Sequence, residues 1–348
     1  MPRPTRRAAL AALALALVAG AAACGAGDDG DAAPGSGSAP AAGDAAFPVT
    51  IEHKYGSTTI AAPPERVVSV GFGDQDPILA LGVVPVGVRD WYGDQPQATW
   101  PWAHDLLEGA KPEVLSADEL NVEAVAALRP DLIVGVSSGM TKDEYESLSA
   151  LAPTLAQSGD VIDYGMPWQD GTRMIGRALG REAEADRLIA GVEERFARVR
   201  ADVPGLKGAE ATVSYVMDET QIGAYGPDDV RGRMLTDLGM VVPDEIAAKA
   251  GDKFYSQFSF EQIGLLDRDL LIWITGEPGV AERIKAHPLR RRLAAAAEGR
   301  EIFLSDMESG AASFSSVLSL PYLLDSLEPQ LAAAIDGDPA TAVPAAAG

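Results

Sequence analysis

The sequence predicts an α/β protein of two Rossmann-like lobes, each built on a parallel sheet, joined by one long rigid α-helix. Three observations support this prediction. Short β-branched runs alternate with helical patterns, one helix-to-strand unit occurs twice, and one long helical pattern separates the two occurrences. The folded part, from Phe47 to about Gly337, is also longer than one hydrophobic core usually serves.

Short strands are predicted where β-branched and other apolar residues cluster. These segments are 66–70, 83–88, 132–134, 211–216, 270–276 and 301–306. After the first strand, Gly71 and Gly73 precede a helix that Asp74 or Asp76 can cap, with Pro77 in its first turn. The same glycines form only half of a dinucleotide-binding fingerprint, because Asp76 stands where the third glycine belongs.

One helix-to-strand unit occurs twice in register. The segments "VEAVAALRPDLIV" and "FEQIGLLDRDLLIWI" superpose at constant spacing, so that Glu123 matches Glu261 and Asp131 matches Asp269. The first copy predicts a helix over about 122–128 that a proline stops. The two lobes are therefore expected to be similar halves. A chance match between two short α/β segments is the alternative.

The segment between the two copies has the apolar spacing of a long helix. The pattern runs from Trp168 to Val203, allowing for Gly180, and Pro204 and Gly205 end it. A helix of this length would act as a rod, about which the lobes rock only a little.

An export signal opens the chain. Arg3, Arg6 and Arg7 precede an apolar run over 8–23, which at roughly 16 residues is shorter than the ~20 that a membrane-spanning helix needs. The residues "TRRAAL" half match a twin-arginine signal, so both the general and the twin-arginine export routes stay open.

The only cysteine follows this run directly. Small residues precede Cys24, and the stretch resembles a bacterial lipobox, although Ala21 stands where leucine is commoner. After Cys24 no large apolar residue occurs before Phe47, a composition typical of a disordered tether. We predict that Cys24 carries a lipid anchor; a cleaved signal that merely contains a cysteine is the alternative.

These patterns divide the chain into six segments. They are a signal peptide over 1–23, a disordered tether over 24–46, an N-terminal lobe over 47–167, a connecting helix over 168–203, a C-terminal lobe over 204–336 and a disordered tail over 337–348.

Charge and composition exclude several classes of function. The net charge is −23 and the isoelectric point is near 4.4, which argues against nucleic-acid binding and against a basic membrane-binding face. A single cysteine excludes disulfides within the chain. His53, His104 and His287 lack metal-ligand spacing, which disfavours a receptor for bare zinc or manganese.

Five motifs in order resemble one family. "PERVVSVGFGDQDPILALGVVPVGVRDWYG", "NVEAVAALRPDLIVG", "YESLSALAPTLA", "GPDDVRGRMLTDLGM" and "FSFEQIGLLDRDLLIWI" are similar to the periplasmic-binding-protein family that delivers ferric siderophores, and in some members haem or cobalamin, to ABC importers. The resemblance covers about 63–333. It implies a substrate-binding protein of the helical-backbone type, with its ligand held between the lobes.

The resemblance and the predicted strand ends together indicate ligand-binding residues, since open parallel sheets place sites at the carboxyl ends of their strands. These candidates are Phe72, Arg89, Trp91, Tyr92, Trp100, Met140, Tyr225, Arg231, Phe254, Tyr255 and Met307. The segment "WYGDQPQATWPW" alone holds three of the five tryptophans. Aromatic walls with few basic residues suit a bulky iron(III)-siderophore chelate, and favour a hydroxamate of low charge over a trianionic catecholate.

Glu123 and Glu261 align with the family's two acidic docking residues, one on each lobe, which meet arginines of the membrane permease. The resemblance thus implies a monomeric, lipid-anchored receptor on the extracytoplasmic face of a bacterial membrane. No catalytic residue, metal ligand or cofactor is expected.

Two other classes of function stay open. "LIVGVSSG" contains the G-x-S-x-G pattern of a hydrolase around Ser137, and His287 follows in the order that an α/β-hydrolase requires, although no His-Gly oxyanion loop precedes it. An exported esterase is therefore one alternative. A lipoprotein that senses or scaffolds without transport is another.

Overall fold

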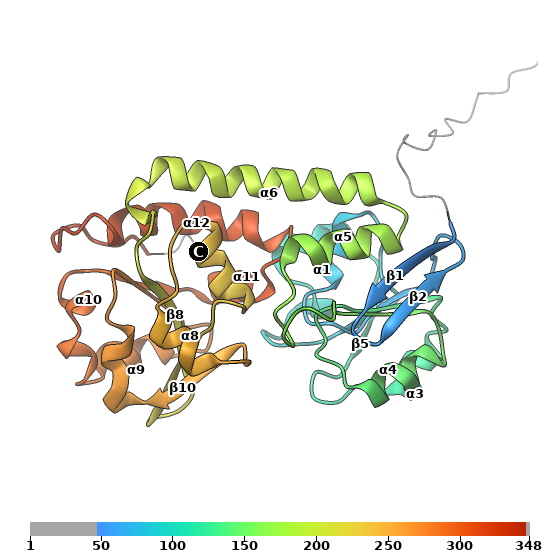
Figure 1. Ribbon diagram of the computed structural model, residues 1–348, viewed down its shortest axis with the longest axis horizontal. Helices are drawn as coiled ribbons and strands as arrows, with labels where there is room; N and C mark the ends of the chain where they lie inside the picture. Colours follow the sequence, from blue (N-terminus) through green and yellow to red (C-terminus); the bar gives the residue numbers. More distant parts are fainter. Residues whose placement is uncertain (1–46, 346–348) are drawn as a thin grey trace, which may run out of the picture. The chain divides into compact units, whose positions relative to one another are not determined.

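The computed structural model describes residues 47–345 (Figure 1). The predicted signal peptide, the lipidation of Cys24 and the predicted tether lie outside these residues. Within the described chain, no helix combines the length and the apolar character needed to cross a membrane.

The N-lobe is built on a five-stranded parallel sheet in the order β5-β4-β3-β6-β7. Its strands are β3 (Val67–Ser69), β4 (Gly87–Arg89), β5 (Glu113–Leu115), β6 (Leu132–Gly135) and β7 (Thr154–Ala156). Its short helices are α1 (Gln75–Ala80), α2 (Pro101–His104), α3 (Val122–Ala127) and α4 (Lys142–Ser149). A separate hairpin, β1 (Val49–His53) with β2 (Gly56–Ile60), precedes the sheet.

Helices cover both faces of this sheet. Val67 and Leu132 pack on one face with Ile78 of α1, whereas Val68 and Ile133 pack on the other face with the apolar residues of α3 and α4. Continuous apolar runs such as "LIV" in β6 therefore reflect burial on both sides, as expected for a parallel sheet.

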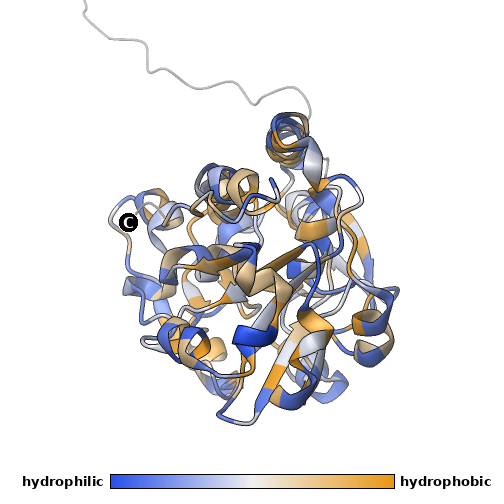
Figure 2. Cartoon of the chain, turned by 90° about the vertical axis from the view of Figure 1, so that its left-hand side faces the viewer, coloured by the Kyte–Doolittle hydropathy of each residue, from blue (hydrophilic) through white to orange (hydrophobic). Residues whose placement is uncertain are grey.

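The C-lobe holds a second five-stranded sheet in the order β10-β9-β8-β11-β12. Its strands are β8 (Ala211–Val216), β9 (Gln221–Tyr225), β10 (Tyr255–Ser259), β11 (Leu270–Ile274) and β12 (Glu301–Leu304). Its helices are α7 (Val230–Asp237), α8 (Asp244–Ala250), α9 (Val280–Ala286), α10 (Ala294–Ala297), α11 (Asp306–Phe314) and α12 (Ser319–Ala334). Figure 2 shows apolar residues gathered along the strands, with hydrophilic residues on the surrounding helices and turns.

Two of the five strands of this second sheet differ from the prediction. Strands β8, β11 and β12 are parallel as expected, but β9 pairs antiparallel with both β8 and β10, and neither β9 nor β10 was predicted. The turn after β8 is too short for a crossover, because Asp218 accepts hydrogen bonds from the backbone N–H groups of Thr220 and Gln221 and so reverses the chain at once.

The segment predicted as one helix over 168–203 forms two helices, α5 (Trp168–Ala178) and α6 (Glu182–Asp202). The break lies at Gly180, whose φ of +69° ends α5. Gly176 allows the two helices to approach closely, since a β-carbon there would lie 2.5 Å from the β-carbon of Ala185.

Helix α6 is the element that joins the lobes. Its residue Ala185 packs in the N-lobe core, whereas Val192, Phe196 and Val199 pack in the C-lobe core. Figure 1 shows α6 running along one side of both lobes. One straight helix is therefore fixed at both of its ends.

The repeated sequence unit has the same structural role in both lobes. Asp131 accepts hydrogen bonds at 2.8 Å from the backbone N–H groups of Glu65 and Arg66, just before β3. Its counterpart Asp269 accepts one at 2.9 Å from the N–H of Glu210, just before β8. Each aspartate thus ties the start of its lobe's central strand to the strand beside it.

The end of the described chain is irregular. Residues 337–345 form no helix or strand, but the half-buried Val343 packs against the C-lobe core. The remainder of the predicted tail, 346–348, lies outside the described residues.

Candidate functional site

A cavity of about 270 Å³ lies between the two lobes. Phe72, Trp91, Ser137 and Tyr164 line it from the N-lobe, and Val230, Arg231, Phe254, Ser313 and Phe314 line it from the C-lobe. Aromatic rings make up much of the wall, and one guanidinium group reaches it. This is the mixture of apolar surface and few polar groups expected of a ligand pocket.

The N-lobe wall is a set of neighbouring aromatic rings. Phe72, in the loop between β3 and α1, stacks on Trp91 with ring centroids 5.3 Å apart and faces Tyr164 at 6.2 Å. The guanidinium carbon of Arg89 lies 4.5 Å from the centroid of the Phe72 ring, within the range of a cation–π interaction.

Arg89 is a half-buried cation whose hydrogen bonds go to neutral groups. It donates to the carbonyl oxygens of Ala117 at 2.9 Å and Val70 at 3.5 Å. Burial lowers its pKa, which Tyr164 and Glu144 partly oppose. Within the described part of the chain, no carboxylate forms an ion pair with it.

The C-lobe wall is organised around a buried ion pair. Arg231 of α7 is held by Asp229 through two hydrogen bonds of 2.7 Å, and it lies 3.7 Å over the ring of Tyr225. Burial alone would lower the pKa of Arg231, but Asp229 more than reverses this effect and raises it. Arg231 also donates to the hydroxyl of Ser313 at 3.4 Å, and both residues line the cavity.

Behind the cavity, aromatic side chains pack the lobes together in an interlobe seam formed by Trp91, Trp100, Trp102, Phe314 and Tyr322. Phe314 of α11 lies 5.3 Å from Trp91, 6.0 Å from Trp100 and 5.7 Å from Trp102. Trp100 and Trp102 stack nearly parallel at 5.0 Å. All three tryptophans of the segment "WYGDQPQATWPW" therefore belong to the interlobe seam.

Two candidate ligand-binding residues have buried side chains that do not line the cavity. Trp100 is 1% exposed and packs in the interlobe seam, whereas Met140 is 5% exposed and belongs to the N-lobe core. Aromatic rings cover Trp100 and apolar side chains of the N-lobe cover Met140.

Of the other candidates, Phe72, Trp91, Arg231 and Phe254 line the cavity. The rest lie beside it or behind it and are not among its lining residues. Arg89 supports the Phe72 ring, Tyr92 donates to the carbonyl of Ser309, Tyr225 supports Arg231, Tyr255 packs on Phe254, and Met307 is half-buried in the first turn of α11.

Sequence reasoning missed Tyr164, Val230, Ser313 and Phe314. Tyr164 has a φ of +63°, unusual for a residue other than glycine, and it directly precedes a glycine. In the sequence, the aromatic residue of "YGMP" was the feature that could have indicated Tyr164 as a cavity residue. Ser313 and Phe314 lie in the buried part of α11, whose small residues give no local sign of a cavity.

Neither aspartate predicted to cap α1 does so through its side chain. Asp74 accepts instead from the backbone N–H of Ser137 at 3.1 Å, and Asp76 accepts from the indole N–H of Trp102 at 2.8 Å and the hydroxyl of Ser316 at 2.5 Å. Both are almost wholly buried, and burial raises the pKa of Asp74 to about 6 and that of Asp76 to about 7.

The two candidate docking glutamates occupy equivalent positions. Glu123 is exposed in the first turn of α3, and Glu261 is exposed in the first turn of η4, a 3₁₀ helix over Phe260–Leu266. Figure 1 shows α3 and β10, the strand that leads into η4, on the side of their lobes away from α6.

The residues of the esterase alternative are held in different places. Ser137 lines the interlobe cavity, whereas the imidazole of His287 stacks on Phe260 at 3.9 Å in a separate pocket of the C-lobe. Within the described residues, no group of three or more metal-ligating side chains is arranged to hold a metal ion.

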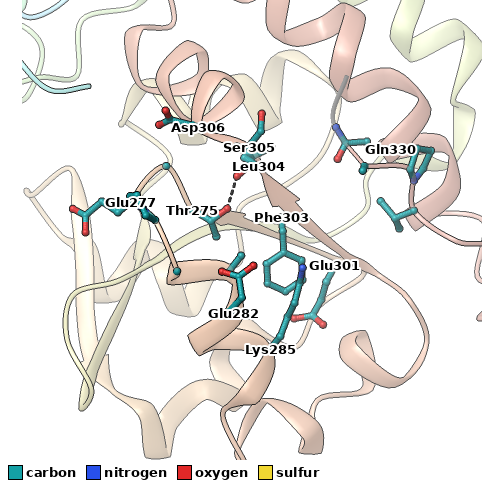
Figure 3. A pocket seen from close by; sticks show the side chains of 17 residues that line it. Thr275, Glu277, Glu282, Lys285, Glu301, Phe303, Leu304, Ser305, Asp306 and Gln330 are labelled. Atoms are coloured by element: carbon teal, nitrogen blue, oxygen red, sulfur yellow. Dashed lines mark hydrogen bonds between the residues drawn. The ribbon is translucent and has the colours of Figure 1, made fainter. Parts of the chain in front are cut away.

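A larger pocket of about 560 Å³ lies in the C-lobe alone (Figure 3). The loop after β11, the edge strand β12 and α9 form it, and Glu282 and Lys285 point into it beside Phe303. Since it holds a single half-buried aromatic ring and no residue of the N-lobe, we place the candidate site in the smaller cavity between the lobes.

Two α/β lobes spanned by one helix, with a cavity between them, define a bilobed substrate-binding protein. The sequence matches the family described as periplasmic binding protein over residues 68–307, and the chain belongs to this family. The match covers the strands of both sheets up to β12.

Named relatives and solved structures agree with this assignment. The probable siderophore-binding lipoprotein YfiY of Bacillus subtilis is 31% identical over 236 residues, which cover 65% of this chain and 68% of the relative. The Fe(3+) dicitrate-binding periplasmic protein FecB of Escherichia coli is 27% identical, covering 72% of this chain and 80% of the relative.

Among solved structures, a periplasmic solute binding protein from Mycobacterium smegmatis has a TM-score of 0.75 and 38% identity, covering 82% of this chain and 98% of the other. The Streptococcus pneumoniae protein PiaA in complex with ferrichrome has a TM-score of 0.72 and 28% identity, covering 83% and 99%. These relatives are named as binding proteins rather than as enzymes.

The buried Asp76 should give the stability of the protein a distinct pH dependence. Its folded pKa of about 7 lies above the ordinary value of 3.8, so the folded state binds a proton that the unfolded state has lost between these pH values. Its contribution to the free energy of unfolding should therefore fall as pH rises from about 4 to about 7, by up to roughly 4 kcal/mol.

Asp76→Asn removes this titration. Relative to the unchanged protein, the variant should gain stability as the pH rises through this window, in urea unfolding followed at pH 4, 5, 6, 7 and 8. A difference in unfolding free energy that is constant with pH would contradict the assignment.

Proposed function

We propose that this protein is the extracytoplasmic receptor of an ABC importer and captures a ferric siderophore in the cavity between its lobes. The observation that carries the proposal is the cavity itself, in which stacked aromatic rings and a guanidinium group from two lobes face one space. Family membership and the relatives named as siderophore- or ferric-citrate-binding proteins support it. The receptor would act without catalysis and as a monomer.

The electrostatics of the cavity favour a ligand of low net charge. Asp229 neutralises Arg231, whereas Arg89, which lies over the ring of Phe72, has no carboxylate partner among the described residues. A hydroxamate chelate, or one with a single excess negative charge, suits this arrangement better than a trianionic catecholate. Ferrichrome, the ligand of the PiaA complex, is the first compound we would test.

Binding should be visible in the intrinsic fluorescence, because Trp91 lines the cavity. Ferric siderophores should quench it in a saturable titration, and Trp91→Leu should remove most of this quenching and weaken binding about tenfold or more. The panel is ferrichrome, ferrioxamine B, ferric citrate, a ferric catecholate, haem and cobalamin.

Trp273→Phe is the matched control, since that tryptophan is buried in β11 away from the cavity. Flat titrations with all six compounds would exclude the receptor proposal. Saturable binding of haem or cobalamin alone would keep the family role and change the ligand. Labelling of Ser137 by a fluorophosphonate would instead revive the esterase alternative.

We further propose that Cys24 carries the lipid anchor that holds the receptor on the outer face of the membrane. Cys24→Ala should release the protein into the soluble fraction while its affinity for the ligand stays unchanged, because no cavity residue lies near this part of the sequence. The measurement is fractionation of cells followed by titration of the released protein. A variant that stays in the membrane would contradict the anchor.

Glu123 and Glu261 are our candidates for docking onto arginines of the permease. Charge reversal of both, Glu123→Arg with Glu261→Arg, should abolish uptake because it replaces two attractions by two repulsions. Each single variant should be intermediate. Ligand affinity should stay near that of the unchanged protein, since both side chains are exposed outside the cavity.

Uptake of the iron-loaded siderophore by cells is compared with the affinity of the purified variants. Glu146→Arg, an exposed glutamate on α4, serves as the control and should leave uptake intact. Normal uptake by the double variant would refute docking, and a parallel loss of affinity would assign these glutamates to the pocket.

A further inference from the structure

Asp76 is a buried carboxylate that both lobes share. It lies in α1 of the N-lobe with 0% exposure. The same oxygen, Oδ2, accepts hydrogen bonds from the indole of Trp102 in the N-lobe and from the hydroxyl of Ser316, in the connection between α11 and α12 of the C-lobe. Burial raises its pKa and these two neutral donors oppose that rise, and no cation forms an ion pair with it among the described residues.

Ser316 is itself held firmly. Its hydroxyl oxygen accepts from the backbone N–H groups of Leu318 at 3.2 Å and Ser319 at 3.0 Å, and its own N–H donates to the Ser319 hydroxyl at 2.9 Å. The carboxylate of Asp76 therefore accepts a hydrogen bond from a rigid turn. This turn lies two residues beyond Phe314, whose ring lines the cavity.

On the other side, Asp76 is rigidly connected to the N-lobe wall. Phe72 lies four residues before it, and Asp74 between them ties this loop to Ser137, which lines the cavity as well. The hydrogen bond from Ser316 to Asp76 thus spans the two chain segments that carry opposite walls of the cavity.

This arrangement costs stability, because the second oxygen of Asp76, Oδ1, is buried and finds no hydrogen-bond partner in the described part of the chain. Apolar contacts already close the interlobe seam; Trp102 packs against Tyr322 at 5.9 Å, and Leu318 packs in a cluster with Leu79. Apolar packing is non-directional, whereas a hydrogen bond to a buried carboxylate fixes one register. The burial of the Asp76 carboxylate, although unfavourable, is explained if its hydrogen bond fixes one register between the lobes.

We propose that Asp76 is a positioning residue, which fixes the placement of one lobe against the other and thereby the geometry of the cavity. The positioning role stands on the contacts above. Its effect on ligand affinity rests in addition on the proposed receptor function.

Asp74 offers a matched control within the same segment. It is 3% exposed and, like Asp76, forms no ion pair with a cation of the described chain, but its hydrogen bond goes to Ser137 of its own lobe. Asp74→Ala therefore removes a buried carboxylate of the same length without removing a bond between the lobes.

The test measures the distance between lobes by pulsed electron paramagnetic resonance. The full chain with Cys24→Ala carries nitroxides on Lys142→Cys in α4 and Ala248→Cys in α8, both exposed. Asp76→Ala should widen the distance distribution at least about twofold, and so should Ser316→Ala, which removes only the donor from the C-lobe. Asp74→Ala should leave the width unchanged.

A second measurement uses ferrichrome, ferrioxamine B and ferric citrate as probes. Asp76→Ala should weaken the binding of whichever probe binds by about tenfold or more, whereas Asp76→Asn, which keeps an acceptor oxygen, should weaken it by no more than about threefold.

The two readouts separate the two proposals. A distribution as narrow as that of the unchanged protein in both Asp76→Ala and Ser316→Ala would overturn the positioning role, and Ser316→Ala alone decides if Asp76→Ala does not fold. Equal widening by Asp74→Ala would also overturn it, because the effect would then not depend on the bond between the lobes. Widening together with a lack of binding by every probe would refute the receptor function and leave the positioning role standing.

Discussion

The ring of Phe314 packs among Trp91, Trp100 and Trp102, and the cavity depends on this contact. Phe314 ends a helix of the C-lobe, whereas the three tryptophans belong to one segment of the N-lobe. Their packing buries large apolar surfaces that neither lobe could cover alone, which supplies a strong drive for the lobes to meet at this place. The same ring lines the cavity, so one side chain both joins the lobes and forms part of the site.

Of the two arginines beside this apolar centre, one is paired with a carboxylate and the other is not, among the described residues. Arg231 and Asp229 neutralise each other in the C-lobe wall, while Arg89 retains its charge beside Phe72. A chelated ferric ion has most of its charge compensated by its own ligand atoms, so it presents a large, weakly charged surface. Aromatic walls with a nearby guanidinium group are complementary to such a surface, whereas a bare metal ion would require several ligating side chains.

The sequence predicted those parts of the fold in which local patterns and tertiary environment agree. Strand β8 covers the predicted 211–216, because an apolar run in a sheet buried on both faces has one natural conformation. Of the predicted strand 83–88, only Gly87 and Val88 lie in β4, since Val83 instead packs against the N-lobe core and Pro85 cannot donate to a ladder. The break at Gly180 was visible as a glycine, but its effect depended on how α5 and α6 pack.

The candidate site was predicted less completely, for a physical reason. Of the candidates that the resemblance and the predicted strand ends indicated, Phe72, Trp91, Arg231 and Phe254 line the cavity. Whether a neighbouring ring faces the cavity or the seam depends on the other lobe, which explains the buried Trp100. Phe314 belongs to a buried helix and has no signal of its own within the sequence.

The position of α6 has a mechanical consequence. Because this helix is fixed in both cores and lies along one side of the lobes, small rotations of one lobe against the other pivot near it. Displacement in a rotation grows with distance from the pivot. The parts of the lobes that lie away from α6, including α3 and the end of β10, therefore sit at the far ends of two lever arms. An angular change too small to disturb the packed seam would still alter the separation of these surfaces. The distance between the surfaces would therefore change more than the width of the cavity.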